Sequence, residues 1–320
     1  MNRRVPRGRE LRSHLVRRLP TTAELATRAP IVLTQRDDRL LAAVHLHGFL
    51  TADLVELAFF PATDDARIWP SSCAYERLRQ LWLWEYLERI ELPVARVLGG
   101  RRPFLYALGR RGLTAVRALQ GGTSTAVRTR RLDRLDHVFV DHDLKAAALW
   151  AIVCNLLRSR SVRAFRWTPE RDLRARRLRV RDPDRPNRWL PFLPDGAFEV
   201  VYRDGRVQHV LVEIDMGTLT LERFRRKVCA FEEFLGRGLF ERHFRREHFE
   251  VAVLTASRRR LEHVWRVVRN EVKQPRWDAY LFTTFEALDP AALQSNAWVS
   301  ADNRLTGLLY PDSNPTKPSP

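Results

Sequence analysis

Cysteine is scarce in this chain, and the few that occur are isolated. The 320 residues include three, Cys73, Cys154 and Cys229, with no C-x-x-C pair and no His/Cys cluster. A disulfide framework and a structural zinc site are therefore excluded. Long apolar runs are missing too, since the longest, residues 146–157, is interrupted by a polar Asn155 and is too short to span a bilayer. The N-terminus is rich in arginine but lacks the apolar segment of an export signal. We therefore expect a cytoplasmic protein without a membrane partner.

Several motifs of enzyme chemistry are also absent, and acidic residues are in the minority. The sequence has no Walker loop, Gly-rich dinucleotide fingerprint, nucleophile elbow or internal repeat. Lys and Arg number 56 against 38 Asp and Glu, which gives a formal net charge of +18. Such an excess favours a polyanionic partner, because basic side chains bind phosphates and release counterions. The alternative is that a GC-rich genome enriches arginine through codon usage.

The length and the distribution of turn residues predict two domains. At 45% hydrophobic residues, 320 residues are enough for two cores. Residues 121–131 contain a Gly-Gly pair and a Ser/Thr cluster, which are typical of a linker. We expect a basic disordered arm over residues 1–30, a first domain over 31–120, a second over 132–300 and a disordered tail over 301–320. The arm either follows phosphates or simply aids solubility.

The first domain reads as three helices followed by a basic β-hairpin. Thr34 is a candidate N-cap for a helix over residues 35–47, Thr51 for a second over 52–60, and a third follows over 73–84. Residues 86–91 and 103–108 then read as strands joined by a basic Gly-Gly tip. This order predicts a winged helix-turn-helix domain, whose third helix would enter the major groove of double-stranded DNA.

Basic and amide side chains on these elements are the candidate DNA contacts. A protein-interaction or spacer module of the same fold is the alternative, because tryptophans near the end of the third helix indicate that part of it is buried. Three arginines also begin a predicted helix of the second domain, where they oppose the helix dipole and suit a phosphate. The candidates are Arg77, Arg79, Gln80, Arg101, Arg102, Arg258 and Arg259.

The second domain is organised around residues 193–227. Asp204-Gly205 is a strong hairpin signal, and a two-residue turn there pairs Arg203 with Arg206. Counted outward, this register places Asp195 opposite Ile214, within one residue. Glu213 and Asp215 flank that position and share a face, since side chains alternate along a strand. Three converging carboxylates suit a hard metal ion, Mg²⁺ or Mn²⁺. Solvated acids at the end of a bulged strand are the alternative.

The order of these residues resembles the PD-(D/E)XK nuclease-like fold. More narrowly, Pro194-Asp195, the run from Val212 to Thr218, and Lys227 are similar to the replication-relaxation family of mobile-element proteins. The resemblance implies a winged helix followed by a nuclease-like mixed α/β domain, over roughly residues 34–285. It departs at one point, because the lysine usual two residues after the glutamate is Asp215 here. Lys227 on the following helix is the candidate replacement.

The resemblance implies DNA processing in plasmid replication or transfer, by metal-dependent nicking or relaxation. Asp195, Glu213 and Asp215 would hold Mg²⁺ or Mn²⁺, with Lys227 as the fourth catalytic residue, and other plasmid replication or transfer proteins are possible partners. A non-catalytic DNA-binding accessory or regulator with a degenerate nuclease-like scaffold is the alternative, favoured by the missing lysine at position 215. An RNA-binding or toxin-type nuclease would share the acids and the charge. A basic insertion over residues 168–188 either holds the phosphate backbone over the acids or is a solvent loop.

Overall fold

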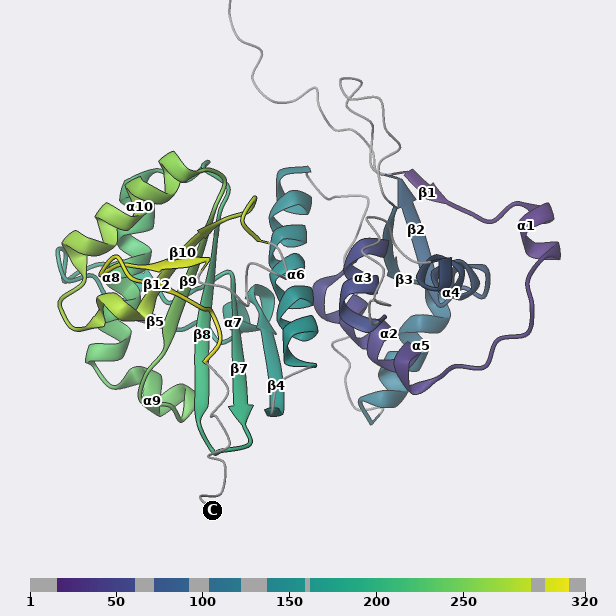
Figure 1. Cartoon of the computed structure of the whole chain (residues 1–320), viewed down its shortest axis with the longest axis horizontal. Helices are drawn as coiled ribbons and strands as arrows, with labels where there is room; N and C mark the ends of the chain where they lie inside the picture. Colours follow the sequence, from purple (N-terminus) through teal and green to yellow (C-terminus); the bar gives the residue numbers. More distant parts are fainter. Residues whose placement is uncertain are drawn as a thin grey trace, which may run out of the picture. The chain divides into compact units, whose positions relative to one another are not determined.

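A computed structural model gives the fold of the chain. It describes residues 16–60, 72–91, 104–121, 137–158, 162–288 and 297–310. The chain folds into two compact units, Met1–Ala147 and Ala148–Pro320 (Figure 1). The division falls within helix α6 (His137–Leu157), later than the predicted linker at 121–131, most of which lies outside the described residues. The fold is mixed α/β.

The first unit contains helices and a small antiparallel sheet. Its elements are β1 (Val16–Arg18), α1 (Thr22–Ala26), α2 (Gln35–His47), α3 (Ala52–Phe59), α4 (Ser72–Leu83), β2 (Leu87–Glu91), β3 (Leu105–Leu108) and α5 (Arg110–Leu119). The strands pair in the order β1-β2-β3, all antiparallel. Leu50, between α2 and α3, adds a bridge to Tyr106 of β3 with N···O distances of 3.0 and 2.8 Å.

Helix α2 begins and ends where the sequence predicts. The Thr34 backbone N–H donates to the Asp37 carboxylate at 2.7 Å, and the Thr34 hydroxyl accepts from the Asp37 N–H at 3.4 Å. This capping box satisfies donors that a helix start leaves unpaired. Gly48 ends the helix with a φ of 84°, a conformation that glycine adopts without strain.

The expected disordered arm is wrong for residues 16–26. Val16–Arg18 form an edge strand on β2, and α1 begins with a capping box between Thr21 and Glu24. The sequence did not reveal these two elements because strand β1 has three residues and helix α1 has five. Both are too short to show a recognisable apolar periodicity. Residues 1–15 lie outside the described part of the chain.

The second unit is built on a mixed seven-stranded sheet of order β12-β11-β10-β9-β8-β7-β4. Strand β9 is parallel to β8 and β10, and the other neighbours are antiparallel. Its elements after α6 are β4 (Val162–Pro169), α7 (Glu170–Ala175), β5 (Arg179–Arg181), β6 (Trp189–Pro191), β7 (Gly196–Tyr202), β8 (Val207–Asp215), α8 (Leu221–Gly236), α9 (Leu239–Phe244), β9 (Glu250–Thr255), α10 (Arg258–Glu271), a 3₁₀-helix (Arg276–Ala279), β10 (Tyr280–Thr284), β11 (Trp298–Ser300) and β12 (Leu305–Thr306).

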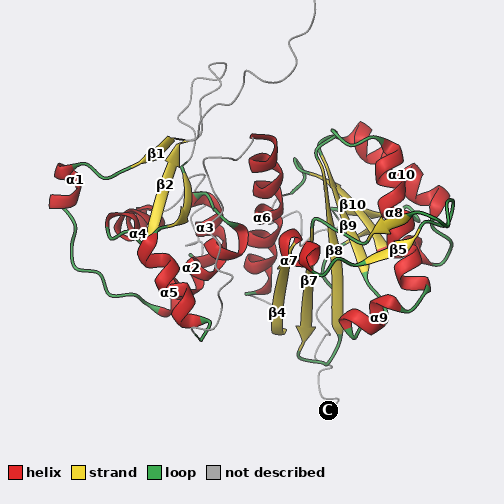
Figure 2. Cartoon of the chain, turned by 180° about the vertical axis from the view of Figure 1, so that it is seen from behind, coloured by secondary structure: helices red, strands yellow, loops and turns green. Residues whose placement is uncertain are grey.

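Helices α8 and α10 pack together on one face of this sheet (Figures 1 and 2). Their apolar sides contribute Phe224, Val228 and Val264 to a core that also contains Leu211 of β8 and Val253 of β9. Both helices begin with a side-chain cap, Thr220 for α8 and Ser257 for α10, each accepting the N–H three residues later. The sheet and its helices thus hold the C-terminal end of β8 next to α8.

The hairpin between β7 and β8 differs by one residue from its prediction. The Tyr202 N–H donates to Arg206 O at 2.9 Å, so the loop has three residues and Gly196 pairs with Val212. Of the Asp-Gly pair only Gly205 has a positive φ, 89°, whereas a type I′ turn requires two. The Asp204 carboxylate instead accepts the Arg206 N–H at 3.0 Å and stabilises the longer loop. Continuing this register places Asp195 across from Glu213 rather than from Ile214.

The chain after residue 284 also differs from expectation. Phe285–Leu288 form no helix, and residues 289–296 lie outside the described part. The predicted disordered tail is wrong over 301–310, because β12 joins the sheet and Leu308 and Leu309 are buried. Leu308 O accepts a hydrogen bond from Gln208 Nε2 at 2.8 Å. Gln208 lies on β8, so these residues are held by the centre of the unit.

The structure contains, among its described residues, no helix with enough apolar length to cross a bilayer.

Candidate functional site: two carboxylates and a lysine

Asp195 immediately precedes β7, and Glu213 lies across from it on β8, at one end of the β7–β8 pair. The Asp195 N–H donates to Val212 O at 2.9 Å, and its Oδ2 accepts the Ile214 N–H at 2.8 Å. These two bonds fix the carboxylate against the backbone of β8. The Glu213 side chain is 3% exposed and that of Asp195 10%. Two acids are therefore brought together in a nearly water-free position, where they require a cation.

Lys227 supplies that cation. Its Nζ donates to Asp195 Oδ1 at 2.9 Å and to Glu213 Oε2 at 2.5 Å. Burial alone lowers the pKa of Lys227, but the charges of Asp195 and Glu213 outweigh it and raise the pKa above its usual value. The lysine is therefore an ammonium donor at neutral pH and not a base. Lys227 thus contacts both acids, as a replacement for the lysine missing at position 215 would have to do.

Asp215 is not part of this cluster. Its Oδ2 accepts two hydrogen bonds from Arg260 of α10, at 3.0 and 2.8 Å, and its Oδ1 accepts the Gly217 N–H at 2.7 Å. Arg260 also donates to Leu219 O at 2.7 Å. The expected convergence of three carboxylates is thus replaced by two separate groups. The sequence analysis counted Arg260 among the three arginines that suit a phosphate and did not foresee this pairing. Asp215 lies 45 residues earlier, and the parallel pairing of β8 and β9 brings the two residues together.

The donor set agrees with one mode of magnesium binding. No three His, Cys, Asp or Glu within the described ranges are grouped so that they alone would hold a metal ion. Mg²⁺ in phosphate chemistry commonly takes one or two carboxylates, with water and substrate oxygens as its remaining ligands. Asp195 and Glu213 supply such a pair, with the Lys227 ammonium between them. The residues present fit this kind of site, and Asp215 is not needed for it.

The predicted DNA contact Arg77 has a structural role inside the first unit. Its Nε donates to Asp37 Oδ1 at 2.8 Å, its Nη2 contacts Asp37 Oδ2, and the same Nη2 donates to Val32 O at 2.8 Å. Asp37 is fully buried. Burial raises the pKa of this carboxyl, but its hydrogen bonds with Arg77 and Thr34 outweigh that effect, and the pKa lies below its usual value. The pair thus ties α4 to the start of α2.

The other predicted DNA contacts differ in their exposure and in their hydrogen-bond partners. Arg79 donates to the Thr27 hydroxyl at 2.6 Å, and Gln80 Nε2 donates to Glu76 at 2.7 Å, both with part of the side chain accessible. Arg258 and Arg259 are exposed at the start of α10, with Arg258 3.9 Å from Glu262. Arg101 and Arg102 lie outside the described residues.

A basic hairpin close to Asp195 in the sequence was expected only as an irregular insertion. Strands β5 and β6 place Arg179, Arg181 and Trp189 on one exposed face, with both guanidinium groups over the indole ring at 4.8 and 4.1 Å. Arg225 of α8 anchors the connecting loop through a 2.5 Å contact with Asp184. The alternating sequence RVR and WLP was the available signal for strands.

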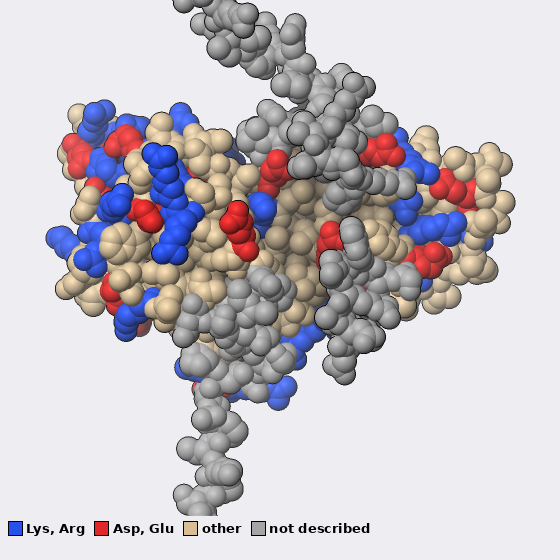
Figure 3. Space-filling view, turned by 45° about the horizontal axis from the view of Figure 1, so that its top comes forward, with Lys and Arg blue, Asp and Glu red and all other residues tan. Residues whose placement is uncertain are grey.

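Basic side chains are interspersed with acidic ones over the described part of the face drawn in Figure 3. Ion pairs such as Arg226 with Glu222 at 2.9 Å and Arg237 with Glu233 at 2.8 Å also place basic side chains next to acidic ones. On the described part of that face, basic side chains therefore do not gather into one separate patch.

Comparison with known proteins gives one match. No curated protein and no solved structure matches the chain. The family model described as replication-relaxation matches residues 41–246, more than half of the chain. This span includes most of the first unit together with Asp195, Glu213, Asp215 and Lys227. Membership of this family suggests a role in replication or relaxation of a plasmid or other mobile element. The chain belongs to the replication-relaxation family.

Proposed function

We propose that the protein binds double-stranded DNA of a mobile element and hydrolyses a phosphodiester bond in it, nicking or relaxing DNA during plasmid replication or transfer. The observation that carries this proposal is the contact of Lys227 with both Asp195 and Glu213. An acid pair with a lysine at the end of a hairpin, inside a mixed sheet, is the arrangement expected of a PD-(D/E)XK nuclease-like domain.

Each of the three side chains has a defined task in this proposal. Asp195 and Glu213 would hold Mg²⁺ or Mn²⁺, which supplies Lewis-acid polarisation of a phosphate oxygen and lowers the pKa of a bound water. Lys227 is protonated, so it would stabilise negative charge on the phosphate and orient the attacking water as a hydrogen-bond donor. Asp215 and Arg260 would keep the end of β8 and the start of α10 in place.

The first unit supports the DNA-binding part. The order of α2, α3 and α4, followed by the β2–β3 pair and the Leu50 bridge, agrees with a winged helix-turn-helix. In that assignment α4 is the recognition helix. Arg79 and Gln80 are then its candidate contacts, and Arg101 and Arg102 belong to the connection between the two strands. Arg77 is excluded from this set because Asp37 already binds it.

The β5–β6 hairpin would hold the DNA backbone near the acids. Pro191 ends β6 only four residues before Asp195, so the Cα atoms of these two residues lie within about 14 Å of each other. Arg179 and Arg181 have guanidinium groups oriented by Trp189, and both side chains are exposed. Arginine suits bidentate contact with phosphate. They would offset the repulsion between the carboxylates and an approaching strand.

The test is Mg²⁺- and Mn²⁺-dependent nicking of supercoiled plasmid by the full chain. We expect Asp195→Asn and Lys227→Met to lower the nicking rate by at least about a hundredfold, the range for removing one electrostatic group from such a site. Asp172→Asn and Lys273→Met are matched controls, because both residues are exposed. A gel shift at two salt concentrations should show unchanged DNA binding for the site variants.

The outcome also separates the proposal from its alternative. DNA binding without cleavage by the wild type on supercoiled, linear and single-stranded substrates would contradict the nuclease function. It would favour a DNA-binding accessory or regulator with a degenerate nuclease-like scaffold. Cleavage that persists in Asp195→Asn would show instead that the reaction uses another site.

A further inference from the structure

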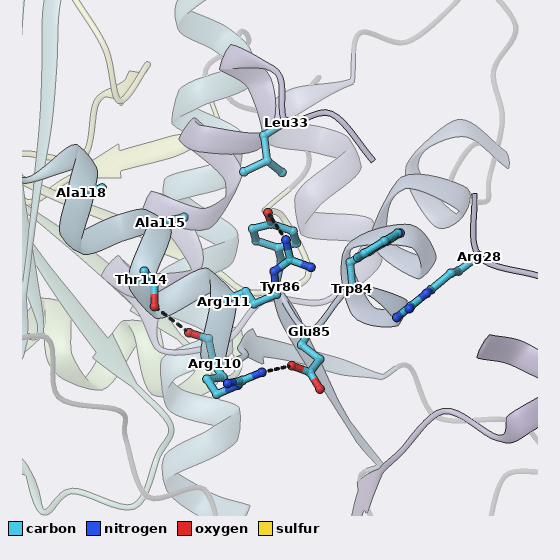
Figure 4. A pocket seen from close by; sticks show the side chains of 10 residues that line it. All are labelled: Arg28, Leu33, Trp84, Glu85, Tyr86, Arg110, Arg111, Thr114, Ala115 and Ala118. Atoms are coloured by element: carbon cyan, nitrogen blue, oxygen red, sulfur yellow. Dashed lines mark hydrogen bonds and ion pairs between the residues drawn. The ribbon is translucent and has the colours of Figure 1, made fainter. Parts of the chain in front are cut away.

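The first unit contains a basic pocket that the proposed cleavage does not use. It is a cavity of about 660 Å³ between the residues around Arg28, the turn from α4 into β2, and the first turns of α5 (Figure 4). Three arginines line it, Arg28, Arg110 and Arg111, with Glu85 as their acidic neighbour. The formal charge of this lining is therefore positive.

Two glycines set the distance between α5 and the turn. A Cβ at Gly109 would lie 2.3 Å from Glu85 O, and one at Gly112 would lie 2.1 Å from Tyr86 O. Neither position accepts a side chain without movement of the backbone. The Gly109 N–H donates to Tyr86 O at 2.9 Å, and the Arg111 N–H donates to Glu85 O at 3.1 Å. The sequence Gly-Arg-Arg-Gly at 109–112 thus places two arginines beside Glu85 and Tyr86.

Aromatic rings orient two of the arginines without neutralising them. The Arg28 guanidinium lies 4.2 Å from the centre of the Trp84 ring, and that of Arg111 lies 4.7 Å from the Tyr86 ring and 5.3 Å from Trp84. Arg111 also donates to the Tyr86 hydroxyl at 3.2 Å. Neither Arg28 nor Arg111 has a carboxylate partner among the described residues, whereas Arg110 pairs with Glu85 at 3.0 Å. A cation on an aromatic face keeps its charge and most of its N–H donors.

We propose that this pocket binds the phosphate group of a nucleotide. Guanidinium groups bind phosphate oxygens through paired N–H donors, and two of them oriented in advance lose little side-chain entropy on binding. Trp84 is itself fixed, since its Nε1 donates to Ala29 O at 2.8 Å. The phosphate belongs either to a DNA strand, as a 5′ end or an internal linkage, or to a free nucleotide. The proposal is independent of the reaction proposed for Asp195, Glu213 and Lys227.

The experiment measures binding by the full chain in EDTA, so that cleavage does not contribute. Fluorescence anisotropy is recorded with a 3′-labelled oligonucleotide duplex carrying a 5′ phosphate or a 5′ hydroxyl, and dAMP is tested as a competitor. Arg28→Ala and Arg111→Ala should each weaken phosphate binding by roughly tenfold, the effect of one charge-assisted hydrogen bond. Arg117→Ala removes the same charge from an exposed position of α5 and should change the affinity about twofold or less.

A further variant, Thr114→Glu, tests the pocket without removing the packing of an arginine on an aromatic ring. Thr114 is exposed on α5 four residues after Arg110, and Thr114→Glu adds a competing carboxylate to the pocket without removing any ring contact. A loss of affinity confined to the 5′-phosphorylated duplex identifies the 5′ end of a DNA strand as the ligand. An equal loss of affinity for both duplexes identifies an internal phosphate. A loss of competition by dAMP identifies a free nucleotide. All three support the pocket. Affinities of Arg28→Ala, Arg111→Ala and Thr114→Glu equal to that of Arg117→Ala for every probe would overturn it.

Discussion

Arg260 on α10 holds Asp215 at the last position of β8 with two N–H···O bonds to a single carboxylate oxygen, 3.0 and 2.8 Å long. Asp215 is 2% exposed and the Arg260 side chain 14%. The pair joins the end of the strand that carries Glu213 to the helix that follows β9. The pair therefore helps to fix the position of the β8 backbone next to Asp195, Glu213 and Lys227.

Replacing Arg260 should destabilise the protein strongly. Arg260→Ala leaves a buried, uncompensated carboxylate, which costs about 3–5 kcal/mol in the free energy of unfolding. Urea unfolding followed by circular dichroism measures this cost. Arg259→Ala, at the exposed neighbouring position, is the control and should change stability by no more than about 0.5 kcal/mol. Equal effects of the two variants would show that the Arg260–Asp215 pair contributes nothing.

Substitutions of Arg77 and Arg79 should affect different properties: the first the stability of the protein, the second its affinity for DNA. Arg77→Ala strands the buried Asp37 and should lower the free energy of unfolding by about 3 kcal/mol. Arg79→Ala removes a side chain that is 30% exposed, and should instead weaken DNA binding by a few fold and reduce its salt dependence. Thermal unfolding and a salt-dependent gel shift measure the two effects. A gel shift unchanged by Arg79→Ala would remove α4 as the proposed recognition helix.

His209 should make the stability of the second unit depend on pH. Burial lowers the pKa of this imidazole to about 4, and the nearby Glu199 carboxylate, 3.7 Å away, offsets only part of that effect. The unfolded chain binds the proton with a pKa of about 6.5, so the unfolded state is favoured as the pH falls. The contribution is complete above pH 6.5 and is lost between about 6.5 and 4, an effect on the order of 3 kcal/mol.

The variant His209→Phe tests this dependence. A phenyl ring retains the contacts with the Phe240 and Phe244 rings, whose centroids lie 5.0 and 5.6 Å from that of His209. Melting temperatures between pH 4 and 7.5 should fall less steeply for His209→Phe than for the wild type, and the exposed His248→Phe should follow the wild type. Parallel curves for all three proteins would contradict the assignment.

Leu308 should behave as a core residue although it follows the last strand. Its side chain is fully buried, whereas Leu305, three residues earlier, is 65% exposed. Leu308→Ala should therefore cost about 2–5 kcal/mol in the free energy of unfolding, and Leu305→Ala less than about 0.5 kcal/mol. Denaturant titration of both variants measures the difference. A Leu308→Ala variant as stable as Leu305→Ala would support the disordered tail that composition alone predicts.

Local signals were sufficient for much of the fold. Thr34 caps the helix that follows it, as its hydroxyl side chain and the apolar spacing after it predict. The hairpin at Asp204-Gly205 was also foreseen, and Lys227, the candidate replacement for the missing lysine, does contact the acids. These features depend on neighbours within a few turns of the chain, which a single sequence displays.

Long-range pairings explain what the sequence did not predict. Arg260 reaches Asp215 across 45 residues, and Arg77 reaches Asp37 across 40. Nothing in the composition near Asp215 or Arg77 distinguishes a structural partner from a metal or a DNA phosphate. The hairpin register moved by one residue because the Asp204 side chain stabilises a longer loop. That shift places Asp195 across from Glu213. It depends on the length of the turn, which the residue types alone did not determine.

The place of β12 at the edge of the sheet has a consequence for synthesis on the ribosome. The chain makes β4, β7 and β8 long before residues 305–310, yet the Gln208 amide of β8 donates a hydrogen bond to Leu308 O. Until those residues emerge, β11 presents an unpaired edge and the Gln208 amide lacks this acceptor. Until β12 pairs with β11, the unit is therefore exposed to wrong pairing with other chains, and we expect closure of this edge to be its final folding step.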